Sequence, residues 1–415
     1  MWKDTATKLD RRRANIRRVA LLLTVCMLVL AAYLFGRSQS LAGISTEDRE
    51  SAALFAEALD VVKDEYVDRE TVDPNEQTYG AIEGMIDSLS DEGHTRFLTP
   101  EEVGKTEEVI SGKYVGVGVQ LDSKDDEAVV SSPLDGSPAE EAGIKPGDIL
   151  VAVDGESVRG EEVEWVAEKV RGTEGSQVEI TVLRDEEEHK FSMERAELAV
   201  PVASWYLIPG ADAAHLRLVT FSENSAEALE RAIFEAREAG AERFVLDLRN
   251  NSGGVLGEAE KIAAQFLPAG SEIYTRKNAD GTEEETTVPE KNEPLDAPLV
   301  VLVNEGSASS SEIVAGALRD NDRATVIGDT TVGTGTVLSE YRLSDGSAIM
   351  LAIAEWLTPN GDFIRESGIE PDVEAELEEG QEPRTPDETK GLSREEIFAE
   401  DAQLERAFEV LTDKD

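Results

Sequence analysis

The sequence predicts a mixed α/β protein with several domains, and three observations support this expectation. The chain has 415 residues, of which 40% are hydrophobic, so it has room for two or three domains with a sizeable core. Residues 198–385 alternate strand patterns with helix patterns, which is typical of a layered α/β domain. Residues 112–195 show mainly strand patterns, and residues 45–110 show mainly helical spacing of apolar side chains.

Residues 1–37 are expected to form a cytoplasmic tail and a single transmembrane helix. A cluster of arginines precedes an uninterrupted apolar run from Val19 to Phe35, which is just long enough to span a bilayer. The basic flank predicts a cytoplasmic N-terminus, so residues from about 38 onward should lie outside the cytoplasm. A cleaved signal peptide is the alternative. We favour an uncleaved anchor at residues 19–36, because the run is long and no clear cleavage site follows it.

The composition excludes some classes of partner. The chain has 88 Asp and Glu residues against 40 Lys and Arg residues, a formal net charge of −48, which repels nucleic acid. We therefore expect no DNA or RNA partner and interpret the acidic residues as a solvated coat. The single cysteine, Cys26, lies within the apolar run, so no disulfide can form within one chain.

Residues 45–110 are expected to form a helical N-terminal region. Helical spacing begins near Ser45, and a second helix is predicted from Gln77 to Leu89. A loop at residues 91–102 contains His94 and leads into another short helix. A lone loop histidine is usually structural or exposed, but it can also be a catalytic base.

Residues 112–197 resemble a PDZ domain in the order of their elements. The pattern comprises a glycine-containing strand at 114–121, a strand at 128–130, a short helix at 137–143, and a turn, strand and hairpin turn at 144–155. The resemblance implies that a peptide adds to the sheet edge while a loop turns backbone N–H groups toward its terminal carboxylate. The residues that it places in this loop are Tyr114, Val115, Gly116, Val117 and Gly118. A loop that serves only as a tight turn would explain the glycines but not the whole pattern.

The α/β region has two strand-to-helix transitions that could build a site. One strand ends at Arg249 and continues into Asn250-Asn251-Ser252-Gly253-Gly254 before a helix at 257–266. Another strand, at 300–303, continues into a serine-rich turn and a helix that begins near Ser307. Such turns expose backbone N–H groups at the carboxyl edge of a sheet, where a helix dipole also favours negative charge. The simpler interpretation of the serines is an N-cap, with Glu312 in the first helical turn.

Several motifs in order resemble the carboxyl-terminal processing (tail-specific) serine peptidases, with the peptidase domain at residues 198–375. The motifs are the PDZ pattern, Leu248 to Gly254, Ser307 to Glu312, and Gly368-Ile369-Glu370-Pro371-Asp372-Val373. The resemblance implies that Ser309 is the nucleophile of a Ser-Lys dyad. It also implies an oxyanion hole formed by the N–H of Gly253 or Gly254 together with that of Ser310. The sequence has no His/Cys/Asp cluster at metal-ligand spacing and no phosphate loop, so we expect no cofactor.

The chain departs from the family at the residues that supply and orient the general base. The family's lysine and glutamine positions are Thr334 and Leu338 in this sequence. A threonine hydroxyl has no useful basicity near neutral pH, so Ser309 loses its expected activator. The nearest substitute base in sequence to the glycine loop is Lys261. The other candidates are Lys291, His215 and His94.

Three hypotheses follow for a chain with this change. The first is an active peptidase with a substitute base, and the second is a catalytically silent relative that binds polypeptides with a free C-terminus as an adaptor or chaperone. The third is a membrane-tethered scaffold whose acidic surface and C-terminal helix matter more than either site. Residues 376–415 are expected to form an acidic linker and that helix, from Ser393 to Thr412.

Overall fold

The computed structural model describes residues 46–89, 91, 94–124, 127–134, 136–184, 187–377, 381–386 and 388–413. The chain divides into two compact units, Met1–Ala81 and Ile82–Asp415, which are described separately. The predicted anchor at residues 19–36 lies outside the described residues. Within the part that is described, none of the helices has both the length and the apolar character needed to cross a bilayer.

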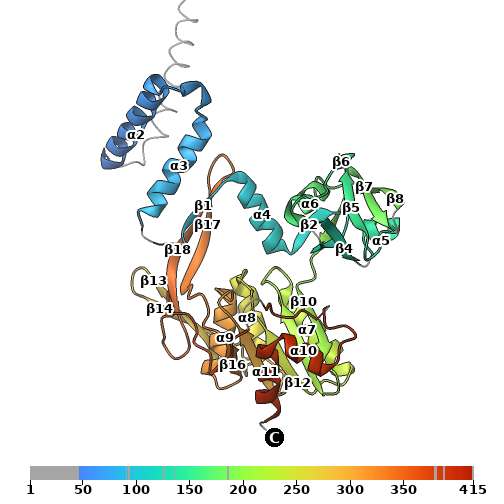
Figure 1. Ribbon diagram of the computed structural model, residues 1–415. Coiled ribbons are helices and arrows are strands. Elements are labelled where there is room, and N and C mark those ends of the chain that lie inside the picture. Colours follow the sequence, from blue (N-terminus) through green and yellow to red (C-terminus); the bar gives the residue numbers. More distant parts are fainter. Residues whose placement is uncertain are drawn as a thin grey trace, which may run out of the picture. The chain divides into compact units, whose positions relative to one another are not determined.

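The first unit is helical, as expected. It contains α2 (Thr46–Glu65), a 3₁₀ turn (Arg69–Thr71) and the start of α3 (Pro74–Asp87) (Figure 1). Helix α3 begins earlier than the predicted Gln77, because Pro74 occupies the first helical position, where a missing N–H costs nothing.

Residues 113–199, which include the region that resembles a PDZ domain, form a small β-rich domain of the second unit. Its sheet has the strand order β3 (Val119–Lys124), β4 (Glu127–Pro133), β5 (Ile149–Val153), β7 (Gln177–Arg184) and β8 (Glu187–Glu194), with β6 (Glu156–Ser157) paired to β5. Helices α5 (Pro138–Ala142) and α6 (Val163–Val170) complete the domain (Figure 1). A separate ribbon pairs β2 (Lys113–Gly116) with β9 (Ala196–Ala199). The edge strands of the main sheet are therefore β3 and β8.

The central sheet of the second unit is mostly parallel. Its order is β10 (Ala203–Leu207), β11 (Ala213–Leu218), β12 (Arg243–Asp247), β15 (Leu299–Val303), β16 (Thr325–Gly328) and β19 (Val373–Glu374), and only the β10–β11 pair is antiparallel. Successive residues of β15 point to opposite faces, so Val301 and Val303 join one core and Val300 and Leu302 another. Helices α7 (Ser225–Glu238), α8 (Leu256–Ala264) and α9 (Ser310–Asp320) cover the first face.

The other face of this sheet is covered by two C-terminal helices, α10 (Arg394–Glu400) and α11 (Ala402–Thr412). The single helix predicted from Ser393 to Thr412 is therefore wrong. The helix is interrupted at Asp401, whose φ of −143° is not helical and whose carboxylate instead accepts the Leu404 N–H at 2.9 Å, beginning α11. Buried Ile397, Leu404 and Leu411 pack against the sheet.

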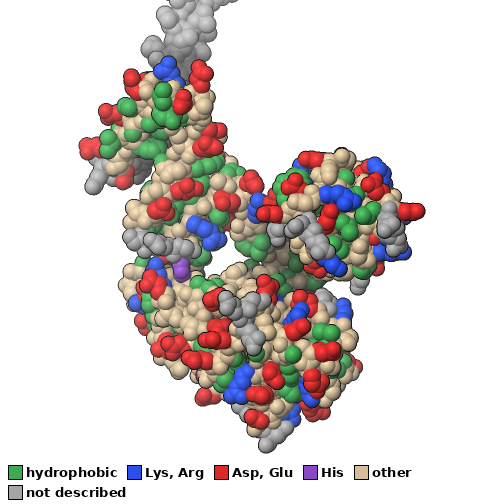
Figure 2. Space-filling model, viewed as in Figure 1, with side chains coloured by type: hydrophobic (Ala, Val, Ile, Leu, Met, Phe, Trp, Pro, Cys, Tyr) green, Lys and Arg blue, Asp and Glu red, His purple; other side chains and the backbone are tan. Residues whose placement is uncertain are grey.

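A second sheet lies beside the first and carries part of the cavity described below. Its order is β1 (Arg96–Leu98), β18 (Ala348–Leu357), β13 (Glu272–Asn278) and β14 (Glu283–Thr287), with β17 (Thr336–Arg342) also paired to β18. The acidic residues of β14 thus pair with β13 in an antiparallel hairpin. Helix α4 (Pro100–Ser111) follows β1 behind a capping box of Thr99 and Glu102. Acidic side chains are spread over the visible surface rather than gathered in one patch (Figure 2).

Candidate active site

Two neighbouring parallel strands bring the serine turn and the glycine loop together. Strand β12 leads into the loop at 250–254, and β15 leads into the turn before α9. Because parallel strands end at the same edge of a sheet, these connections lie side by side. The Asn251 carbonyl accepts the Ala308 N–H at 3.1 Å and the Ser311 hydroxyl at 2.7 Å, and Ser307 Oγ donates to the Leu248 carbonyl at 2.8 Å.

Ser309 is the N-cap of α9 and has an unusual backbone conformation. Its φ is +54° and its ψ is −113°, which non-glycine residues rarely adopt. Its N–H donates to Glu312 Oε2 at 2.7 Å and to Thr334 Oγ1 at 3.1 Å. Its side chain is half-buried rather than enclosed in the core. Strained backbone of this kind is often found where a fold places a functional group.

Glu312 holds the turn and the following loop in place. The carboxylate is fully buried and accepts hydrogen bonds from the Ser309 N–H, the Thr331 hydroxyl and the N–H groups of Gly333 and Thr334, at 2.6 to 3.0 Å. These four donors come from the serine turn and from the loop at 331–334, so one carboxylate joins the two segments. The sequence identified Glu312 only as a capping residue. Its link to residues 331–334 was not predictable, because those residues approach it only in the folded chain.

The glycine loop provides close approach and available N–H groups, but not from every predicted residue. A Cβ atom at Gly253, whose φ is +97°, would lie 2.8 Å from Ser309 Cβ and 2.9 Å from Ser310 N. The Gly253 N–H donates to Asn251 Oδ1 at 2.9 Å, so it does not face an oxyanion. Among the described residues, the N–H groups of Gly254 and Ser310 have no protein acceptor. Of the two alternatives for the glycine donor, Gly254 fits this geometry.

Ser309 opens onto a cavity of about 560 Å³. The glycine loop, the serine turn, α4, β1 and β17 all contribute to its wall. Its polar and charged lining includes Arg96, Thr220, Ser252, Thr334, Thr336 and Glu340, and its apolar lining includes Val109, Ile110, Leu256, Ile313, Leu338, Met350 and Trp356. A pocket of this size with a few convergent polar groups can accommodate several side chains of an extended peptide.

Thr334 lies next to Ser309, where the family would place its lysine. It is buried, and its hydroxyl oxygen accepts the Ser309 N–H. Leu338 lies in β17 and lines the same cavity. The structure therefore brings Ser309, Ser310, Gly253, Gly254, Thr334 and Leu338 together. Neither Thr334 nor Leu338 can accept a proton from Ser309.

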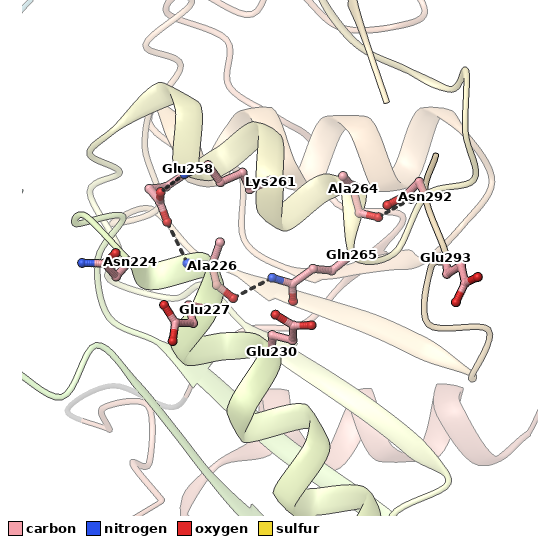
Figure 3. Close-up of a pocket in the computed structure, with 10 residues that line it drawn as sticks. All are labelled: Asn224, Ala226, Glu227, Glu230, Glu258, Lys261, Ala264, Gln265, Asn292 and Glu293. Carbon is pink, nitrogen blue, oxygen red and sulfur yellow. Dashed lines mark hydrogen bonds and ion pairs between the residues drawn. The ribbon is translucent and has the colours of Figure 1, made fainter. Parts of the chain in front are cut away.

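The structure describes all four of the substitute bases considered, and of these only His94 lines this cavity. Lys261 lies in a different pocket, between α7 and α8, where its Nζ is 2.6 Å from Glu258 Oε1 (Figure 3). The hydrogen bond to Glu258 raises the pKa of Lys261, which leaves it protonated and unsuited to act as a base. His215 is fully buried on β11 with its Nε2 2.8 Å from Asp247 Oδ2. Lys291 is exposed on the loop after β14 and does not line the Ser309 cavity.

The predicted peptide-binding loop is divided between two elements. Tyr114, Val115 and Gly116 belong to β2, which pairs with β9, so this segment does not form an open loop. Val117 and Gly118 form the turn before the edge strand β3. Val117 is buried, and a Cβ atom at Gly118 would lie 2.3 Å from Ser137 Cβ. Of the five predicted residues, only Val117 and Gly118 lie outside a strand, directly before β3.

A serine at a helix N-terminus, beside available N–H groups at the carboxyl edge of a layered α/β sheet, has the arrangement of a serine hydrolase nucleophile. Comparison with known proteins gives the particular family. The model of peptidase family S41 matches residues 212–375, and the model of the PDZ domain matches residues 129–184. The chain belongs to peptidase family S41, whose members are serine peptidases, and it is similar to CtpA-like serine proteases.

Three relatives illustrate this similarity. The "Probable CtpA-like serine protease" of Staphylococcus aureus (strain COL) is 33% identical over 356 residues, which cover 86% of this chain and 71% of the relative. The protein of the same description in Staphylococcus haemolyticus (strain JCSC1435) is 34% identical over 346 residues, or 83% and 69%. The solved photosystem II D1 C-terminal processing protease is 30% identical, with 78% of this chain and 92% of that chain covered and a TM-score of 0.45.

Proposed function

We propose that this protein is a membrane-anchored peptidase that cleaves polypeptides in their carboxyl-terminal regions outside the cytoplasm, with Ser309 as its nucleophile. The observation that carries the proposal is the strained Ser309, which faces a cavity beside the available N–H groups of Gly254 and Ser310. Such preorganised donors are commonly the largest contribution to catalysis of acyl transfer.

The chemistry follows from this placement. The Ser309 hydroxyl attacks the scissile carbonyl carbon, a C–O bond forms, and the carbonyl electron pair moves onto the oxygen. The N–H groups of Gly254 and Ser310 stabilise that oxyanion, and the positive end of the α9 dipole adds to their effect. The peptide C–N bond then breaks, the amine leaves with the proton that the Ser309 hydroxyl gave up, and water hydrolyses the acyl-enzyme.

We further propose that the PDZ domain binds the free C-terminus of the substrate. Strand β3 is at the edge of its sheet, and helix α6 packs near it. A peptide strand could therefore pair with β3 while the turn at Val117 and Gly118 approaches its carboxylate.

Residues 19–36 would hold the protein at the membrane with its N-terminus in the cytoplasm. Recovery of the full chain in the membrane fraction, and release of a chain that lacks residues 1–37, would support the anchor.

A catalytically silent relative is the second candidate, and Thr334 with Leu338 favours it. A missing base typically lowers the rate by a factor on the order of 10⁴ to 10⁶. In this form the protein would bind polypeptide C-termini without cutting them. If free C-terminal peptides did not bind at all, the scaffold hypothesis would remain.

The test is a peptide assay on the full chain in mild detergent, with matched peptides that end in a free or an amidated carboxylate. We expect cleavage of the free form, weaker cleavage of the amidated form, and none by Ser309→Ala. Binding without cleavage would contradict the peptidase. If the double variant Thr334→Lys with Leu338→Gln then restored cleavage, the silent alternative would be established.

A further inference from the structure

His94 lines the same cavity as Ser309, and one of its two ring nitrogens is in hydrogen-bond contact with a threonine. Its Nδ1 lies 3.0 Å from Thr336 Oγ1, at the start of β17. Thr336 is two residues from Thr334, whose hydroxyl contacts the Ser309 N–H. Only Gly335, in the loop that leads into β17, separates the residue that contacts Ser309 from the residue that contacts His94.

The ring contact engages Nδ1 and leaves Nε2 as the nitrogen that can act. If Nδ1 donates its proton to Thr336 Oγ1, Nε2 carries the free lone pair. Among the described residues, no protein group hydrogen-bonds to His94 Nε2. This is the arrangement that a histidine base requires, because a second group must hold one ring nitrogen so that the other can accept a proton.

A second set of contacts fixes the segment that carries His94. Asp91 accepts hydrogen bonds from the Thr95 hydroxyl and the Arg365 guanidinium, and the Ala352 N–H donates to Thr95 Oγ1 at 3.1 Å. A Cβ atom at Gly335 would lie 2.8 Å from Arg365 Cβ, so Arg365 also packs against the residue between Thr334 and Thr336. One arginine thus braces both the His94 segment and the loop beside Ser309.

The other ionisable groups near His94 do not compete for this role. Arg96 and Glu340 line the same cavity, and Asp91 and Arg365 lie behind the loop. The Glu340 carboxylate pairs with Arg342 at 2.8 Å, and the Asp91 carboxylate is engaged by Arg365 and Thr95. Arg96 and Arg365 carry guanidinium groups, which are donors only and cannot act as proton acceptors.

We propose that His94 is the general base of this peptidase and replaces the lysine that the chain lacks at position 334. This inference rests on the proposed function of Ser309. His94 Nε2 accepts the Ser309 proton, directly or through one water molecule, as the hydroxyl oxygen bonds to the scissile carbon. The resulting imidazolium returns that proton to the departing amine. The same pair of transfers, with water in place of Ser309, releases the acyl group.

The test compares His94→Ala with His189→Ala in the full chain in mild detergent, because His189 lies on β8 of the PDZ domain and does not line this cavity. We expect His94→Ala to lower kcat about 10⁴- to 10⁶-fold with little change in KM, and His189→Ala to change neither. Free imidazole should restore part of the His94→Ala activity. The kcat of the unmodified protein should fall on acidification, because only neutral histidine accepts a proton.

The outcomes separate this inference from the proposed function. If Ser309→Ala abolishes cleavage while His94→Ala retains full kcat, the base assignment is overturned and the peptidase stands. A loss of activity in His94→Ala that imidazole does not restore, together with a pH-independent kcat in the unmodified protein, would show that His94 only braces the loop. If His94→Ala does not fold, labelling of Ser309 in the unmodified protein by a fluorophosphonate decides the question: it should slow on acidification. A rate that does not change with pH overturns the base, and a complete lack of labelling removes the proposed function as well.

Discussion

At the scale of single residues, Gly253 determines how closely the glycine loop can approach Ser309. Its φ is +97°, and a side-chain carbon added there would lie only 2.8 Å from Ser309 Cβ, so no space remains for a larger residue. Its own N–H is engaged by Asn251, so its contribution is room and not a hydrogen bond to the substrate. Even a methyl group added at Gly253 should therefore displace Ser309 and Ser310 and lower the rate of catalysis.

We expect Gly253→Ala to lower kcat about 100-fold, because displacement of reacting groups by about 1 Å has an effect of this size. Gly240→Ala is the matched control. Gly240 has a similar φ of +105°, nothing lies within 4 Å of a Cβ placed there, and it does not line the cavity. Both variants should lose about 1 to 2 kcal/mol of stability from backbone strain, but only Gly253→Ala should lose activity. Equal kcat values for the two variants would contradict the crowding that we describe.

At the scale of secondary structure elements, a buried charge network connects β11, β12 and the C-terminal helices beneath the glycine loop. The Arg249 guanidinium contacts Asp247 Oδ2 at 2.7 Å and Asp401 Oδ1 at 2.8 Å, and all three side chains are fully buried. His215 Nε2 contacts the same Asp247 carboxylate at 2.8 Å. Because Arg249 directly precedes the loop at 250–254, this network anchors the base of the candidate oxyanion hole.

We expect Asp401→Ala to destabilise the protein by about 3 to 5 kcal/mol, because it leaves Arg249 buried without one of its two carboxylate partners. Asp413→Ala, at the exposed end of α11, is the control and should change the free energy of unfolding by less than about 0.5 kcal/mol. Chemical denaturation measures both. If the two variants unfolded alike, α10 and α11 would not be part of the cooperative core.

The network also predicts a dependence on acid. Burial alone would raise the pKa of Asp247, but the Arg249 cation and the His215 hydrogen bond outweigh it and hold that pKa well below its usual value. The ionised carboxylate therefore stabilises the fold above the unfolded-state pKa, about 3.9, and this contribution is lost as the pH falls below that value. We expect the free energy of unfolding to fall more steeply with acidification below about pH 4 in the unmodified protein than in Asp247→Asn. Parallel curves would contradict this assignment.

At the scale of the whole molecule, the dominant feature is the excess of acidic side chains. A formal net charge of −48 spread over the surface produces repulsion that opposes the compact state (Figure 2). Some surface pairs act in the other direction, such as Lys105 with Glu168, but both side chains are more than half exposed and such pairs contribute little. Repulsion should therefore outweigh the surface ion pairs.

We expect the melting temperature to rise as salt increases from about 0.01 M to about 0.5 M. Over this range the screening length falls from about 30 Å to a few ångströms, which weakens long-range repulsion more than contacts at short distance. NaCl and KCl should act alike, because the effect depends on ionic strength. A melting temperature that falls with salt would mean that surface ion pairs dominate.

The residues alone were sufficient for the family, the α/β class and the location of the candidate nucleophile. These depend on local signals: apolar periodicity, glycines after a strand, and a serine before a helix. Three of the five residues expected in the peptide-binding loop were instead found in β2, because strand pairing with β9 involves residues about 80 positions away. The break at Asp401 was also missed: its carboxylate accepts the Leu404 N–H, which begins α11, and also contacts Arg249, which is far away in the sequence.

The assignment of the general base required the folded structure. In sequence Lys261 is close to the glycine loop and His94 is remote from it, yet Lys261 lies in another pocket and His94 shares the cavity of Ser309. Topology thus reverses the order of these candidates, because β1 pairs with β18 and β18 pairs with β17, which begins at Thr336. Residue types reveal which chemistry is available, whereas the distances that chemistry requires are set by strand pairing and packing between segments far apart in the chain.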